Sequence, residues 1–173
     1  ATQANTLTMT GAGSVIVESL GASTNLGSVS VAALTLQLAG NVDFGGSVHG
    51  TPAITIDTDS DGTARTLDIV DATFNPASIA VDNDVTLTMS ATQANAETIT
   101  GAGTVIVTSL GASTNLANVS TTNLTLQLAG NITYAGTFNT GPALTFDTDS
   151  DGTARTVDIT DATNLPASIA VDD

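Results

Sequence analysis

Residues 34–44 read LTLQLAGNVDF, and residues 124–134 read LTLQLAGNITY. Within each segment, apolar side chains alternate with polar ones on both sides of a central Ala-Gly-Asn group. A period of two residues is typical of a β-strand that buries one of its faces. Each segment therefore predicts two strands joined by a tight turn, and the spacing of 90 residues indicates a repeat.

The repeat extends over the whole chain, because a shift of 90 residues aligns the remainder without a gap. Long segments return with few changes: GAGSVIVESLGASTNL (11–26) as GAGTVIVTSLGASTNL (101–116), and DTDSDGTARTLDI (57–69) as DTDSDGTARTVDI (147–159). We call residues 1–90 repeat 1 and residues 91–173 repeat 2. Where they differ, inward positions exchange one apolar residue for another, as with Val48 and Phe138. The pattern of inward and outward side chains is therefore shared by both repeats.

Nine runs in repeat 1 have the composition of strands, and Gly, Asn, Asp or Pro separates nearly all of them. These runs are residues 6–10, 14–18, 28–32, 34–38, 42–44, 53–57, 66–70, 78–81 and 85–89. No window has convincing helical periodicity, although residues 21–26 have room for one short turn. The chain is therefore predicted to be all-β.

Two all-β architectures fit this pattern. In a parallel β-solenoid (β-helix) each coil takes roughly 20–25 residues, so each repeat would make about four coils and the chain about eight. Small residues suit such coils, because inward side chains lie in layers ~4.8 Å apart. The alternative is two tandem immunoglobulin-like β-sandwich domains, one per repeat. A sandwich usually needs a large buried aromatic, and repeat 1 offers only Phe44 and Phe74, so we favour the solenoid.

The charge of the chain excludes one class of partner. It has 17 acidic residues against two arginines, for a formal net charge of -15. A nucleic-acid partner needs a basic face, and anionic membranes repel such a chain.

No apolar run approaches the ~20 residues of a membrane helix, so membrane insertion is not expected. The absence of cysteine and lysine favours an extracellular or cell-surface location.

One sequence motif predicts metal binding. Residues 57–62 and 147–152 both read DTDSDG, which matches the D-x-D-x-D-G calcium loop. Ca²⁺ prefers about six to eight oxygen ligands, and alternate carboxylates of a tight loop turn toward one centre. The seventh residue would offer its carbonyl, and a carboxylate at the twelfth position would close the site. The predicted ligands, for one Ca²⁺ per repeat, are Asp57, Asp59, Asp61, Thr63 and Asp68, and in repeat 2 Asp147, Asp149, Asp151, Thr153 and Asp158.

A simpler interpretation of these loops remains open. Asp and Gly are common in solvated corners for turn reasons alone, and both loops share one origin. The only cations, Arg65 and Arg155, are interpreted as local partners of nearby carboxylates. His49 becomes Asn139 in repeat 2 and has no companion ligands, so it predicts neither zinc binding nor catalysis.

Three runs resemble a known family: NTLTMTGAGSVIV (5–17), LTLQLAGNVDFGGSV (34–48) and LTLQLAGNITYAGTF (124–138). They are similar to the β-strand repeats of large bacterial exported adhesins, the filamentous-haemagglutinin-like and autotransporter-passenger families. The resemblance implies a right-handed parallel β-helix, export, and a role in adhesion, matrix or a surface layer. The Asp loops resemble those of dockerins, without the flanking helices. The 90-residue period is closer to tandem sandwich repeats of very long secreted adhesins.

We therefore expect a structural unit of an extracellular bacterial adhesin, fibre or surface layer, and not an enzyme. The expected partners are further copies or neighbouring repeats, because repeat 2 ends before the counterpart of the strand at 84–90 and an unpaired edge invites strand addition. The alternative function is a carbohydrate- or ligand-binding module, with a surface glycan as partner. An exposed cleft lined by Phe44, Tyr134 or Phe138 would favour this alternative, and burial of those rings would favour the structural role.

Three N-x-S/T sequons, at Asn118, Asn123 and Asn131, are explained by the Asn- and Thr-rich composition.

Overall fold

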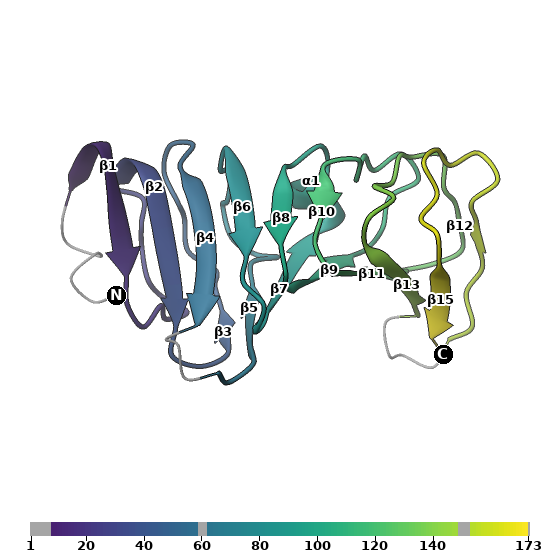
Figure 1. Cartoon of the computed structure of the whole chain (residues 1–173), viewed down its shortest axis with the longest axis horizontal. Helices are drawn as coiled ribbons and strands as arrows, with labels where there is room; N and C mark the ends of the chain where they lie inside the picture. The colour runs from purple at the N-terminus through teal and green to yellow at the C-terminus, as the bar shows by residue number, and fades with distance from the viewer. Residues whose placement is uncertain (1–7, 59–61, 149–152, 173) are drawn as a thin grey trace.

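The computed structural model describes residues 8–58, 62–148 and 153–172. These residues wind into a parallel β-solenoid of about seven turns, with two long sheets running along its length (Figure 1). Every strand pair among them is parallel, as successive turns of one solenoid require. The solenoid prediction is therefore confirmed, and the tandem-sandwich alternative, which needs antiparallel pairs, is wrong.

The strands form three sheets. The six-stranded sheet contains, in spatial order, β1 (Met9–Val17), β2 (Val29–Leu38), β4 (Ala53–Thr58), β6 (Ser78–Val81), β8 (Ile99–Gly101) and β10 (Val119–Ser120). The seven-stranded sheet contains β15 (Ile169–Asp172), β13 (Ala143–Asp147), β11 (Asn123–Gln127), β9 (Thr104–Thr108), β7 (Val85–Ser90), β5 (Arg65–Asp68) and β3 (Val42–Asp43). The smallest sheet pairs β12 (Ile132–Thr133) with β14 (Val157–Asp158).

The turns of the solenoid have two lengths. The shorter kind leads from Leu34 to its strand partner Ile54, and the longer kind leads from Ile54 to its partner Ile79. Each longer turn contains an Asp-rich loop, as the pairing of Val42 with Leu67 also illustrates. Because the longer turns use more residues, the chain makes about seven turns where about eight were expected.

Equivalent residues of the two repeats lie on different sides of the solenoid. The column of inward residues through Leu34 and Ile79 continues to Val119, four turns after Leu34. The repeat counterpart of Leu34 is Leu124, which comes after Val119 in the sequence and lies in the seven-stranded sheet. Four turns therefore use fewer residues than one repeat contains. Repeat 2 is consequently rotated about the axis by one side of the coil, and the counterparts of β3 and β5 form the separate pair β12–β14.

Side chains inside the coils form one continuous apolar core. Leucine, isoleucine and valine columns fill most of it, and all five aromatic rings of the chain are buried within it. In repeat 2, the rings of Tyr134 and Phe138 stack with centroids 4.6 Å apart, and Phe146 meets Phe138 edge-on at 6.4 Å. Burying a large apolar side chain contributes roughly 1.5–3 kcal/mol, so this core stabilises the rod along its whole length.

A single-turn helix, α1 (Ala91–Ala94), joins the repeats and was not predicted from sequence. Ser90 caps it, and Oε1 of Gln93 accepts a hydrogen bond from the backbone N–H of Ser90, which completes a capping box. The amide of Gln93 also donates to the carbonyl oxygens of Ile69 (2.6 Å) and Ala72 (3.1 Å) in the preceding turn. Gln93 therefore fastens the start of repeat 2 to repeat 1.

The expected strand positions agree well with those observed. The run at 78–81 coincides with β6, and the runs at 42–44, 53–57, 66–70 and 85–89 overlap β3, β4, β5 and β7. The runs at 6–10 and 14–18 were expected to be separate, but β1 continues through the gap between them. In the same way β2 joins the runs at 28–32 and 34–38 into one strand. In repeat 2 the same sequence bends at these positions, into β8 and β9 and into β10 and β11.

Candidate functional site

The predicted calcium ligands begin and end on two different sheets. Asp57 is near the end of β4 in the six-stranded sheet, and Asp68 ends β5 in the seven-stranded sheet. In repeat 2, Asp147 ends β13 and Asp158 ends β14. Thr63 and Thr153 are exposed. The middle ligands Asp59, Asp61, Asp149 and Asp151 lie outside the described residues.

An arginine lies at the base of each corner where the acidic loop begins. Arg65 is only 7% exposed, and its Nη1 donates a hydrogen bond to the carbonyl oxygen of Leu38. Leu38 is the strand neighbour of Thr58, the residue that follows Asp57. In repeat 2, Nη1 of Arg155 donates to the carbonyl oxygen of Thr148. Both guanidinium groups therefore bring a positive charge and a backbone contact to the start of an acidic loop.

The carboxylates at the twelfth position already accept hydrogen bonds from their own turns. Oδ1 of Asp68 accepts from the backbone N–H of Val70 at 2.9 Å. Oδ1 of Asp158 accepts from the backbone N–H and the hydroxyl of Thr160, at 3.0 and 2.8 Å. These bonds, the backbone one foremost, hold the pKa of Asp158 below its ordinary value. The carboxylate is thus ionised at neutral pH and has one oxygen engaged in the turn.

Over residues 8–58, 62–148 and 153–172, no three His, Cys, Asp or Glu side chains come together as a metal-binding group. The described ends of each Asp loop supply the first and the last predicted carboxylate only. The calcium site therefore remains a prediction from the sequence motif.

A shallow depression recurs at the same place in both repeats. In repeat 1 it has a volume of about 410 Å³ and is lined by Asn41, Val42, Asp43, Thr66 and Asp68. Its counterpart in repeat 2, of about 360 Å³, is lined by Asn131, Ile132, Thr133, Thr156 and Asp158. Asp43 and Asp68 occupy paired positions on adjacent strands, whereas Thr133 replaces the first carboxylate in repeat 2. An acid pair that only one repeat possesses does not define a catalytic site shared by both.

Sequence reasoning missed the role of the Asn residues in these depressions. Oδ1 of Asn41 accepts a hydrogen bond from the backbone N–H of Thr66 at 2.9 Å, and Asn131 accepts from Thr156 at 2.8 Å. Each bond links a corner to the next turn. The signal was present in the Ala-Gly-Asn group shared by both repeats, but the partner belongs to another turn and follows only from the coil length.

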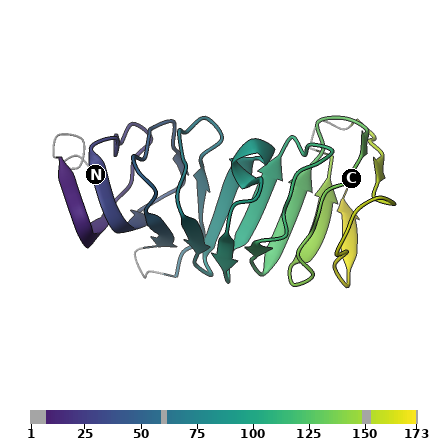
Figure 2. The ribbon, with the colours of Figure 1, turned by 90° about the horizontal axis from the view of Figure 1, so that it is seen from above.

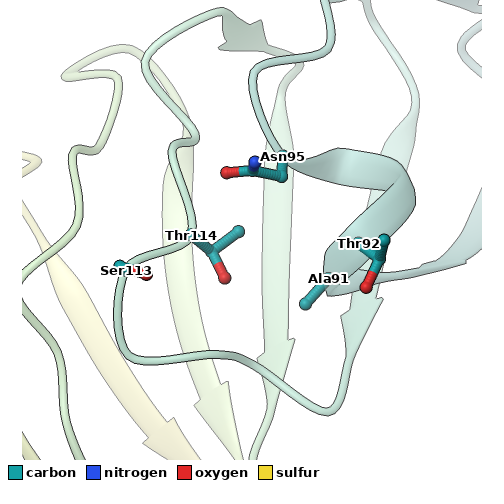
Figure 3. Close-up of a pocket in the computed structure, with 5 residues that line it drawn as sticks. All are labelled: Ala91, Thr92, Asn95, Ser113 and Thr114. Carbon is teal, nitrogen blue, oxygen red and sulfur yellow. The ribbon is translucent and has the colours of Figure 1, made fainter.

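A third depression lies beside α1 and is lined by hydroxyl and amide groups (Figure 3). Its volume is about 190 Å³, below the ~300 Å³ at which ligand pockets usually begin. Its polar groups take part in the fold. Oδ1 of Asn95 accepts from the backbone of Asn115 at 2.8 Å, and the Thr114 carbonyl accepts from the Tyr134 hydroxyl at 2.6 Å. We therefore interpret this depression as part of the structure and not as a ligand site.

The aromatic rings offer no surface for stacking against a sugar. Phe44, Tyr134 and Phe138, named above as the residues that would line a glycan cleft, are all buried. Burial also raises the pKa of the Tyr134 hydroxyl far above its ordinary value, since the ionised form would lose its hydration. By the criterion set from sequence, this burial favours the structural role.

Comparison of the chain with known protein families, with curated proteins and with solved structures gives no match. In the described part of the chain, no helix is long and apolar enough to cross a membrane. The fold and the site thus define a parallel β-solenoid with acidic corner loops.

Proposed function

We propose that this chain is a structural unit of an extracellular bacterial adhesin, fibre or surface layer, stabilised by calcium at its Asp-rich corners. The observation that carries the proposal is the continuity of the two long sheets across the boundary between the repeats (Figure 1). Strand β6 of repeat 1 pairs with β8 of repeat 2, and β7 pairs with β9. A solenoid built in this way gives length and stiffness, because each turn buries the face of its neighbour.

Phe138 is one of the residues that line a further depression, of about 290 Å³, but only 1% of its surface is exposed, so this depression gives the glycan-binding alternative little support. The rings that would form its platform are buried, and the depressions on the described surface are shallow or occupied by structural hydrogen bonds. The structural role therefore remains the proposed one.

The proposed location has a direct test. Antibodies raised against the folded chain should label intact cells of the organism that produces it, because an adhesin, fibre or surface-layer unit is accessible from outside. An antibody against a cytoplasmic protein is the control, and it should label only permeabilised cells. If the chain is also labelled only after permeabilisation, the extracellular role is wrong.

Calcium is proposed to act on the corners by charge. Alternate carboxylates in one short loop repel one another, and a divalent cation removes this cost while tying together the strands at both ends of the loop. Asp57 and Asp68 belong to different sheets, so a bound ion would link the two long sheets across a corner. Arg65 provides part of the counter-charge in either state.

Thermal melting tests the calcium site. With ~10 mM Ca²⁺ and a Kd of about 10⁻⁴ M, as in extracellular modules, binding adds about 2.7 kcal/mol per site, or about 5.4 kcal/mol for the two sites. For a chain of this size, the expected rise in Tm over a chelator-treated sample is roughly 10–20 °C. The double variant Asp57→Asn, Asp147→Asn should lose most of the rise, and Mg²⁺ at equal concentration should not reproduce it. An unchanged Tm in the wild-type chain would discard the calcium site.

A further inference from the structure

The outer surface of the seven-stranded sheet carries an ordered array of threonines. On β5, β7, β9, β11 and β13 the inward residues are buried, and the residues between them point outward. These strands lie side by side along the rod, in teal to green (Figure 2). We call their outward threonines the threonine face: Thr66, Thr86, Thr88, Thr104, Thr125 and Thr145.

Strand pairing sets these side chains in two straight columns. The first column contains Thr66, Thr86 and Thr104, and the second contains Thr88, Ile106, Thr125 and Thr145. The register from β5 to β13 has no shift, unlike that between β1 and β2. The outward groups of the two columns are therefore evenly spaced in both directions.

The rotation of repeat 2 about the axis assembles this face. Thr125 and Thr145 correspond to Thr35 and Thr55 in repeat 1, which lie in the six-stranded sheet. In repeat 2 they instead join the seven-stranded sheet, next to threonines that repeat 1 supplies on β5 and β7. The six-stranded sheet offers no equal, since Asp57 follows Thr55 on the same face of β4. The sequence repeat alone would not have placed these threonines together.

The centre of the threonine face is neutral although the chain carries a formal charge of -15. The outward residues of β7, β9 and β11 are threonine, serine, isoleucine, asparagine and glutamine. Carboxylates stand only at the borders of the face, with Asp68 on β5 and Asp147 on β13. A partner for this face is therefore neutral as well, since the face presents no charge for it to pair with.

The hydroxyl groups of the face are available to such a partner. Of the six, only that of Thr104 has a hydrogen-bond partner among the described residues, the amide of Asn123 at 3.4 Å. All six threonines are half-buried between their strand neighbours. A β-branched side chain in a strand has few χ1 rotamers, so these hydroxyls are held in place before anything binds.

The spacing of the array matches that of water molecules in ice. Neighbouring strands lie ~4.8 Å apart, and outward residues along one strand repeat every ~6.6 Å. In ice, two hydrogen bonds of ~2.75 Å meet at the tetrahedral angle and set second-neighbour oxygens ~4.5 Å apart. The perpendicular repeat, made of two upright and two tilted bonds, is ~7.3 Å. Each step differs by less than about 1 Å, which rotating hydroxyls and one ordered water layer can absorb.

From these observations we infer that the threonine face binds ice. Its hydroxyls hold water at the spacing of the lattice, and the methyl groups of threonine and Ile106 leave that water to bond with its own neighbours. A carboxylate in the same place would lose its mobile hydration when the water freezes, which is costly for a charge. The neutral centre of the face avoids this cost.

Two other occupants fit the face less well. A second copy of the chain would bury roughly 250 Å² on it, far below the ~800 Å² per partner of a stable interface. A polysaccharide surface is usually bound by stacking on exposed aromatic rings, and all five rings of this chain are buried.

Ice-affinity partitioning tests the inference. A dilute solution of the chain is frozen slowly on a cold finger, and protein is measured in the ice and in the remaining liquid. The chain should pass into the ice and should also stop recrystallisation of fine-grained ice. A protein of similar mass without such a face is the control and stays in the liquid. A wild-type chain that the ice excludes as completely as this control would overturn the inference.

Thr125→Tyr locates the activity, because its ring projects from the second column and holds ice away from the neighbouring hydroxyls. Losing two or more of these contacts should raise the concentration that stops recrystallisation at least about tenfold. Thr88→Tyr, on β7, should act in the same way. Thr35→Tyr is the matched control: it lies in the same LTLQL segment, half-buried on the six-stranded sheet, and should leave the activity unchanged.

Tyrosine is favoured in strands, so the three variants should melt within about 2 °C of the wild type. If one of the two face variants melts lower, the other decides. Full activity in the folded face variants would overturn the inference, and so would an equal loss in Thr35→Tyr.

Sedimentation and binding to crystalline cellulose, both without ice, report the other occupants. If ice excludes the chain, and Thr125→Tyr abolishes a dimer or cellulose binding, the face belongs to that partner and the inference is wrong. Ice binding goes beyond the proposed structural role and needs only the fold. Its failure therefore leaves the results of antibody labelling and calcium melting as they stand, and their failure leaves ice binding intact.

Discussion

Gly136→Ala should destabilise the chain by about 3 kcal/mol or more, at the upper end of the range for overpacked sites. A Cβ at this position would lie 2.2 Å from the carbonyl oxygen of Thr114 and 2.5 Å from Cζ of Tyr134. Neither neighbour can retreat easily. The carbonyl belongs to the backbone of the previous turn and accepts the Tyr134 hydroxyl, and the ring is buried against Phe138.

Chemical denaturation of the variant measures this cost directly, and Tm should fall by roughly 6–12 °C. Gly130→Ala is the matched control in the same repeat. Gly130 is exposed, and an added Cβ there meets nothing within 4 Å, so its stability should be unchanged or slightly higher. Equal costs for the two variants would contradict the close packing described around Gly136.

Phe138→Ala should cost about 3–5 kcal/mol, the usual range for deleting a buried aromatic ring. Phe138 is 1% exposed and stacks on Tyr134 at 4.6 Å while meeting the edge of Phe146 at 6.4 Å. Removing it leaves a cavity inside the coil, and the two remaining rings lose their common neighbour. The expected fall in Tm is roughly 6–20 °C.

The first repeat supplies the control for Phe138. Its counterpart there is Val48, which is also buried but loses only about two carbon groups on truncation. At ~0.8 kcal/mol for each CH₂ group, Val48→Ala should cost markedly less than Phe138→Ala. If both variants lose the same stability in denaturation, the aromatic cluster does not strengthen repeat 2 beyond the general core.

The local sequence pattern was sufficient to predict where the strands lie and which of their side chains point into the core. The alternation in residues 34–38 places Leu34, Leu36 and Leu38 inward, and all three are buried. This succeeds because a strand fixes the direction of each side chain by its immediate neighbours alone. The scarcity of large aromatic residues correctly favoured narrow stacked coils over sandwiches.

Helix α1 and the acidic loops were beyond such local reasoning. The four residues of α1 carry no apolar period, and its stability comes from the Ser90 cap and from Gln93 contacts to Ile69 and Ala72 in the preceding turn. For the calcium motif, the sequence provides the spacing of carboxylates. The structure adds that Asp57 and Asp68 lie on strands of different sheets and that Arg65 is buried at the base of the corner.

The sequence by itself therefore determined that the chain is all-β and made from one duplicated unit, and it favoured a stack of parallel strands over tandem sandwiches. Only the tertiary structure decided in which sheet each residue of repeat 2 lies relative to its counterpart in repeat 1. Four turns lead from Leu34 to Val119, whereas one repeat leads from Leu34 to Leu124, so Leu34 and Leu124 lie on different sheets despite identical surroundings in sequence. A residue's neighbours across turns depend on the summed length of every coil between them, and no local pattern records that sum.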